Sequence, residues 1–144
     1  MPDFDSFRSV QFDSLSKRAL NNTIILPLIW GIDGTDAGLI VKYGTIFVAD
    51  RAWELLAVSE NHGTAASAGT LTIEKCAAGV APDNGTTLIG NLSLTSTANT
   101  PVHATLTKTK GDLLIKRGER LVARDSGITG TPSDVKLTIY LKQR

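Results

Sequence analysis

The sequence predicts an all-β protein: an antiparallel β-sandwich of the jelly-roll type with about eight strands. Short runs of apolar residues alternate with polar ones at a period of two, and turn residues (Gly, Thr, Asn, Asp) separate the runs. No segment after residue 22 keeps a helical period of 3.6 residues. An immunoglobulin-type sandwich is the alternative, although the chain lacks the paired cysteines of that class.

The clearest strand is the last one, where Val135, Leu137, Ile139 and Leu141 alternate with polar residues. Successive side chains of a strand point to opposite faces, so this run is apolar on one face only. Earlier strands are expected at residues 23–30, 39–49, 53–60, 70–74, 88–94, 102–107, 113–116 and 121–124.

Several of these runs carry a further expectation. Pro27 confines the first strand to a sheet edge or a bulge, because proline cannot donate to a ladder. Gly44 divides residues 39–49 into two strands or bends one strand. Residues 53–60 are apolar at both parities around Leu55 and Leu56, which predicts a strand buried on both faces. Residues 127–134 are expected to form the last loop.

Composition limits the classes of function. The chain of 144 residues is long enough for one domain with a hydrophobic core. Its net charge of +1 gives no footprint for nucleic acid. The longest apolar stretch, residues 24–32, is interrupted by Pro27 and Gly31 and is too short to span a membrane. A single cysteine, Cys76, excludes an internal disulfide and suits synthesis in a reducing cytoplasm, and the polar start is unlike a signal peptide.

The first 22 residues differ from the rest and are expected to form an N-terminal arm, followed by a sandwich domain over residues 23–144. The arm is polar, yet it holds Phe4, Phe7 and Phe12, three of the four phenylalanines of the chain. One interpretation is that the arm covers an end of the sandwich. The other is that these aromatic side chains are anchors that bind a neighbouring subunit. Phe4, Phe7 and Phe12 are therefore the candidate partner-binding residues.

The sequence shows no catalytic, cofactor-binding or metal-binding constellation, so we expect no enzymatic activity and no cofactor. His62 and His103 are the two histidines, and no spacing supplies the further ligands that a zinc site needs. The Gly-x-Ser-x-Gly motif of serine hydrolases is absent. The charged pairs Asp50-Arg51 and Arg124-Asp125 are read as solvated turns, and Cys76 as a half-buried structural thiol. A pair of carboxylates suited to glycoside hydrolysis stays open, since it depends on distances in space.

The order of several segments between residues 45 and 143 indicates a resemblance to a known family. These segments are Asp50-Arg51-Ala52-Trp53, Val58-Ser59-Glu60-Asn61-His62-Gly63-Thr64-Ala65, Leu71-Thr72-Ile73-Glu74-Lys75, Ala81-Pro82-Asp83-Asn84-Gly85-Thr86, Ser96-Thr97-Ala98-Asn99-Thr100 and Ile115-Lys116-Arg117-Gly118-Glu119-Arg120-Leu121. Together they resemble the head decoration or cement proteins of tailed bacteriophages, which have a jelly-roll fold.

The resemblance implies a structural virion protein on the outer surface of the capsid. It would bridge neighbouring subunits of the major capsid protein, act as a homodimer or homotrimer, and stabilise the shell against the pressure of packaged DNA. Two alternatives stay open. One is another virion component, such as a head fibre base or a tail protein. The other is a carbohydrate-binding β-sandwich module, in which Trp30, Trp53 and Tyr43 would form a stacking platform.

Overall fold

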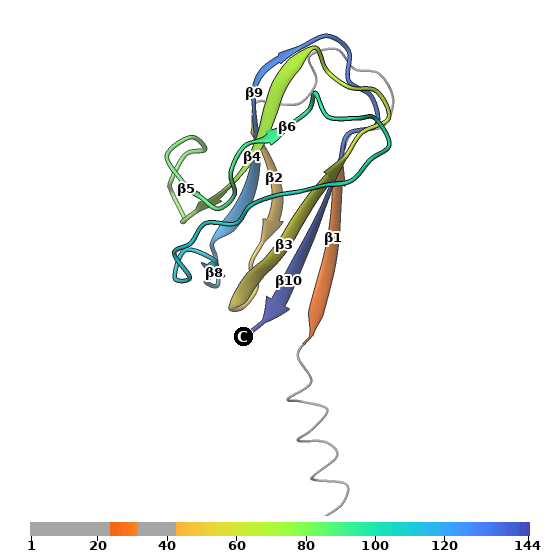
Figure 1. The fold of residues 1–144 in the computed structure, drawn as a ribbon. Helices are drawn as coiled ribbons and strands as arrows, with labels where there is room; N and C mark the ends of the chain where they lie inside the picture. Colours follow the sequence, from red (N-terminus) through yellow and green to blue (C-terminus); the bar gives the residue numbers. More distant parts are fainter. Residues whose placement is uncertain (1–23, 32–42) are drawn as a thin grey trace, which may run out of the picture.

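The chain forms two antiparallel β-sheets packed face to face, as Figure 1 shows for a computed structural model that describes residues 24–31 and 43–144. The prediction of an all-β sandwich is confirmed. The described part of the chain contains no helix, and so none that is long and apolar enough to cross a membrane.

Each sheet is built from three long strands and two short ones. The first sheet contains β1 (Ile25–Gly31), β10 (Lys136–Gln143), β3 (Trp53–Asn61), β7 (Val102–His103) and β8 (Leu114–Ile115). The second sheet contains β2 (Tyr43–Val48), β9 (Arg120–Thr129), β4 (Ala68–Cys76), β5 (Thr86–Thr87) and β6 (Leu92–Ser93).

The connectivity is that of a jelly roll. The strand orders are β1-β10-β3-β7 in the first sheet and β2-β9-β4-β5 in the second. The chain therefore crosses between the sheets after each of β1, β2, β3, β6, β8 and β9. The short strands β7 and β8 both pair with β3, and β5 and β6 both pair with β4. Ten strands therefore fill eight positions, in agreement with the predicted jelly roll of about eight strands.

The core lies between the two sheets and follows the period-two pattern. Leu137, Ile139 and Leu141 of β10 are fully buried, as their alternation predicts, and they belong to the same cluster as Leu71 and Ile73 of β4. The remaining core positions are also mainly Leu, Ile, Val and Ala. This burial is the principal stabilisation of a domain of this size.

Two local expectations are corrected by the structure, and a third is narrowed. β9 continues to Thr129, into the predicted loop, because Ala68 of β4 pairs with Thr129 and offers backbone partners. Residues 88–94 form the short strand β6 and one isolated bridge at Ile89 in place of a continuous strand. Of the two alternatives for Gly44, the described residues show no second strand: Gly44 lies inside β2, which has an irregularity between Thr45 and Phe47, and a side-chain Cβ at Gly44 would come within 2.9 Å of the Trp30 ring.

Candidate interaction surface

The outer face of the first sheet carries apolar side chains where a polar surface is the usual arrangement. Ile25, Pro27 and Ile29 of β1 point outward, and the exposed fractions of the two isoleucines are 53% and 74%. The side chains between them point inward and pack against the core; they are Leu26, Leu28 and Trp30. β1 is thus apolar on both of its faces, although only one is covered by the core.

The neighbouring strands extend this surface. In the sheet register, Pro27 lies opposite Tyr140 of β10, and Tyr140 lies opposite Ala57 of β3. A bulge follows, because the next pair joins Leu141 to Leu55 and leaves Leu56 as an extra residue. Tyr140 is 41% exposed and Leu56 is 38% exposed.

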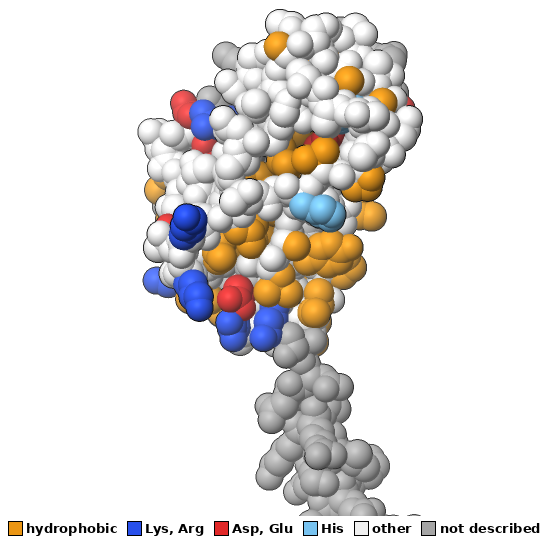
Figure 2. Space-filling model, in the orientation of Figure 1, with side chains coloured by type: hydrophobic (Ala, Val, Ile, Leu, Met, Phe, Trp, Pro, Cys, Tyr) orange, Lys and Arg blue, Asp and Glu red, His pale blue; other side chains and the backbone are white. Residues whose placement is uncertain are grey.

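We call the residues Ile25, Pro27, Ile29, Leu56 and Tyr140 the apolar face. Figure 2 shows hydrophobic side chains gathered on the side of the molecule where β1 lies.

The exposure of Leu56 also shows that the prediction of a strand buried on both faces is wrong for β3. Only the side of β3 that faces the second sheet is covered by the core.

Within the described part of the chain β1 pairs with β10 alone, and its other edge is protected against the addition of a further strand. The backbone N–H of Gln143 donates to the oxygen of Ile24, at 2.9 Å. Since the hydrogen bonds of an antiparallel pair involve alternate residues, the backbone groups of Ile25, Pro27 and Ile29 point away from β10. Pro27 has no N–H and interrupts this outer row of donors. The face of the sheet, rather than its edge, is therefore the surface suited to a partner.

Charged side chains lie at the ends of the apolar face. In the register, Lys142 lies opposite Ile25 and Glu54, and Lys136 lies opposite Gly31 at the other end. The carboxylate of Glu54 forms an ion pair with Arg144 at 2.5 Å. An apolar centre with a charged rim is the arrangement found in protein–protein interfaces.

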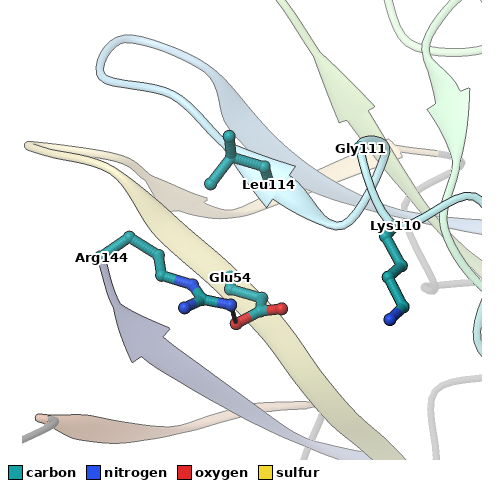
Figure 3. Close-up of a pocket in the computed structure, with 5 residues that line it drawn as sticks. All are labelled: Glu54, Lys110, Gly111, Leu114 and Arg144. Atoms are coloured by element: carbon teal, nitrogen blue, oxygen red, sulfur yellow. Dashed lines mark ion pairs between the residues drawn. The ribbon is translucent and has the colours of Figure 1, made fainter.

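The Glu54–Arg144 pair also lines a hollow of about 440 Å³ beside the turn that leads to β8. Figure 3 shows Arg144 and Glu54 meeting on one side of this hollow, while Lys110 extends from the opposite side with Leu114 above. The lining includes a single carboxylate, and an arginine already neutralises it.

A buried pair of titratable residues lies at the opposite end of β3. Nδ1 of His62 lies 2.8 Å from Oε1 of Glu60, and its Nε2 donates to the backbone oxygen of Ser96 at 3.0 Å. Both side chains are buried, and burial raises the pKa of Glu60. His62 directly follows the end of β3, and its hydrogen bond holds the segment around Ser96 to this end of the strand. This pair links the end of β3 to the segment around Ser96 within the fold.

A second polar cluster fastens the segment between β4 and β5 to the second sheet. Arg124 of β9 forms ion pairs with the buried Glu74, at 2.8 Å, and with the exposed Asp83, at 2.5 Å. The backbone N–H of Asp83 donates to Glu74, and Arg120 donates to the oxygen of Val80. The prediction that Arg124 belongs to a solvated turn is therefore wrong, since it lies within β9 and pairs with a buried carboxylate.

Other residues singled out in the sequence take structural positions. Asp50 and Arg51 form an exposed ion pair at 2.7 Å, which agrees with the solvated turn predicted there. Cys76 is fully buried at the end of β4 rather than half-buried, and burial raises the pKa of its thiol. Among the described residues, no three His, Cys, Asp or Glu side chains come close enough to hold a metal ion.

The aromatic residues of the two binding hypotheses have different outcomes. Phe4, Phe7 and Phe12 lie outside the described residues. Trp53 is buried, where its ring makes a T-shaped contact with Phe47 and its Nε1 donates to Asp50. Trp30 is half-buried against the core, so the two indoles form no exposed stacking platform. The side chain of Tyr43 lies outside the described part of the chain.

Comparison with protein-family models, with curated proteins and with solved structures finds no match to this chain.

The apolar face was missed in the sequence, although a signal for it is present. Residues 24–30 are apolar at both parities, and Pro27 already confines this strand to an edge. An edge strand that is apolar on both sides predicts an apolar outer surface. The contribution of Leu56 had no such signal, because it depends on the position of the bulge in the pairing of β3 with β10.

Proposed function

We propose that this protein is a structural component of a tailed-phage virion that decorates the outside of the capsid. In this role it bridges neighbouring subunits of the major capsid protein, acts as a homodimer or homotrimer, and stabilises the shell against the pressure of packaged DNA. The observation that carries the proposal is the apolar face on a well-packed jelly roll. The resemblance of residues 45–143 to head decoration proteins supports the same role.

The apolar face favours a function that works through protein contacts. Single exposed apolar residues are common on soluble proteins, but contiguous patches mark surfaces that bind other proteins. On this face, the side chains of three neighbouring strands contribute to one patch. The carboxylates described above are, by contrast, either buried in the fold or paired with an arginine.

The mechanism of stabilisation is thermodynamic linkage. A protein that binds the assembled shell, and not its separated subunits, lowers the free energy of the shell by mass action. Many copies held on one lattice also act together, since each bound site raises the local concentration of its neighbours. Weak individual contacts are therefore sufficient for firm attachment.

The proposal is tested by sedimenting the purified protein with expanded, DNA-free capsids of the phage that carries the gene. We expect saturable binding at a fixed ratio to the major capsid protein, because decoration sites repeat with the lattice. Absence of the protein from the capsid fraction at saturating concentration would contradict the proposal. That result would favour a tail component, a head fibre base or a carbohydrate-binding module.

A further inference from the structure

We infer that the apolar face binds the N-terminal arm of a second copy of this chain, with Phe4, Phe7 and Phe12 as the inserted anchors. This inference rests on the proposed function, because it names the partner of the surface that supports it. It requires that the arm reaches a neighbouring face, that its side chains suit the surface, and that the contact joins two molecules.

The position where β1 begins provides the reach. β1 starts at the end of the sandwich where the C-terminus also lies (Figure 1), and residues 1–23 precede Ile24 there. Phe12 is separated from Ile24 by enough residues to span about 40 Å when extended, at roughly 3.4 Å per residue. β1 itself has seven residues and is about 23 Å long. The chain before β1 is therefore long enough to cross a neighbouring face of this size.

The side chains of the arm match the surface in polarity and charge. Phe4, Phe7 and Phe12 are large apolar side chains, which gain free energy when they leave water to bind an apolar surface. The apolar face offers isoleucine, leucine, proline and tyrosine side chains at its centre. Residues 1–13 carry three aspartates and one arginine, and Lys136 and Lys142 lie at the two ends of the face. These first 13 residues are therefore complementary in charge to the two lysines, while Lys17 and Arg18 make the side-chain charge of residues 1–22 zero overall.

The direction of β1 favours a contact between two molecules. The chain enters β1 at the edge of its own apolar face, because Ile24 and Ile25 are themselves exposed there. To cover that face within one molecule, the chain must reverse immediately before Ile24. To cover the face of a second copy, it continues beyond the end of the sandwich. Pro27 also disfavours the competing arrangement in which two β1 edges pair directly.

The test uses full-length variants and measures mass in solution by light scattering. The arm variant carries Phe4→Ser, Phe7→Ser and Phe12→Ser, and the face variant carries Ile29→Lys. The matched control is Val48→Lys, because Val48 is another apolar strand residue, 60% exposed, on the opposite sheet. A second face variant, Ile29→Ser, separates loss of apolar contact from the introduced charge, and circular dichroism confirms that each variant is folded.

We expect the wild type and the Val48→Lys control to have the mass of two or more chains, and the arm and face variants to have the mass of one. Mixing the arm variant with the face variant then restores a complex, since one supplies an intact face and the other an intact arm. A single-chain wild type, an arm variant that still self-associates, or a mixture that stays dissociated would each overturn the inference.

Capsid sedimentation distinguishes failure of this inference from failure of the proposed function. A wild type that binds capsids but is a single chain in solution overturns the arm–face contact alone. A wild type that self-associates as described but does not bind capsids overturns the decoration role alone.

Discussion

The buried Glu60–His62 pair predicts a specific dependence of stability on pH. Nε2 of His62 faces a carbonyl oxygen, which only accepts hydrogen bonds, so this nitrogen carries a proton. One further proton lies between Nδ1 and Oε1 of Glu60, 2.8 Å apart. Burial raises the pKa of Glu60 and so favours its protonated form, in which the carboxyl group donates this proton to Nδ1.

The perturbation is Glu60→Gln, which replaces the carboxyl group by an amide that also donates to Nδ1 but does not titrate. In the unfolded wild type, Glu60 releases its proton near its ordinary pKa, about 4.3. The folded protein keeps this proton to higher pH, because its pKa is raised. The stabilising effect of the protonated Glu60 is therefore complete below that pH. It is lost as the pH rises towards the folded pKa, by up to about 1.4 kcal/mol per pH unit.

The assay is urea denaturation from pH 4 to 6.5, followed by the fluorescence of the buried Trp53. We expect the free energy of unfolding of the wild type, minus that of Glu60→Gln, to fall as the pH rises. Glu119→Gln, at the turn before β9, reports the effect of the same substitution outside the core. If the difference grows with pH, Glu60 is held as a carboxylate beside a charged His62, and the reasoning is refuted.

Three further predictions concern packing and burial. Arg124→Ala leaves the buried Glu74 carboxylate without its cation and should reduce the free energy of unfolding by about 2–3 kcal/mol in denaturant titrations. Arg124→Lys should give an intermediate value, and an unchanged value for Arg124→Ala would contradict the role of this ion pair. By the same method, Leu137→Ala should reduce the free energy of unfolding by about 2–5 kcal/mol, and Leu56→Ala on the apolar face by less than about 1 kcal/mol. Equal reductions for the two variants would show that the assigned core is wrong. The Cys76 thiol should react with a thiol reagent far more slowly in the native protein than in denaturant, because the thiol is buried and its pKa is raised. Rapid labelling of the native protein would contradict that burial.

Much of the architecture could be predicted from the sequence, because the period-two pattern is a local consequence of burying one face of a strand. The alternation from Val135 to Leu141 placed the core side of β10 correctly. The confinement of Pro27 to a sheet edge is also confirmed, since β1 ends the strand order of its sheet. The same physics gave the jelly-roll fold class, because many short strands require two sheets to bury one core.

Features that depend on pairing between distant segments could not be predicted. The extension of β9 to Thr129 requires the partner Ala68, which lies far away in the sequence. The exposure of Leu56 requires the bulge opposite Tyr140 and Leu141. The burial of His62 requires the backbone of Ser96 to close over it. In each case the deciding contact is set by the three-dimensional arrangement, so no local pattern reports it.

The central claim is that this protein assembles on a capsid and that its apolar face joins copies of this chain to one another there. The most direct measurement is sedimentation of capsids with the wild type, Ile29→Lys and the Val48→Lys control, quantified against the major capsid protein. The account predicts saturable binding for the wild type and the control, and at least a tenfold loss of apparent affinity for Ile29→Lys, since loss of self-association removes multivalent attachment. Equal binding of all three proteins, or binding by none of them, would contradict it.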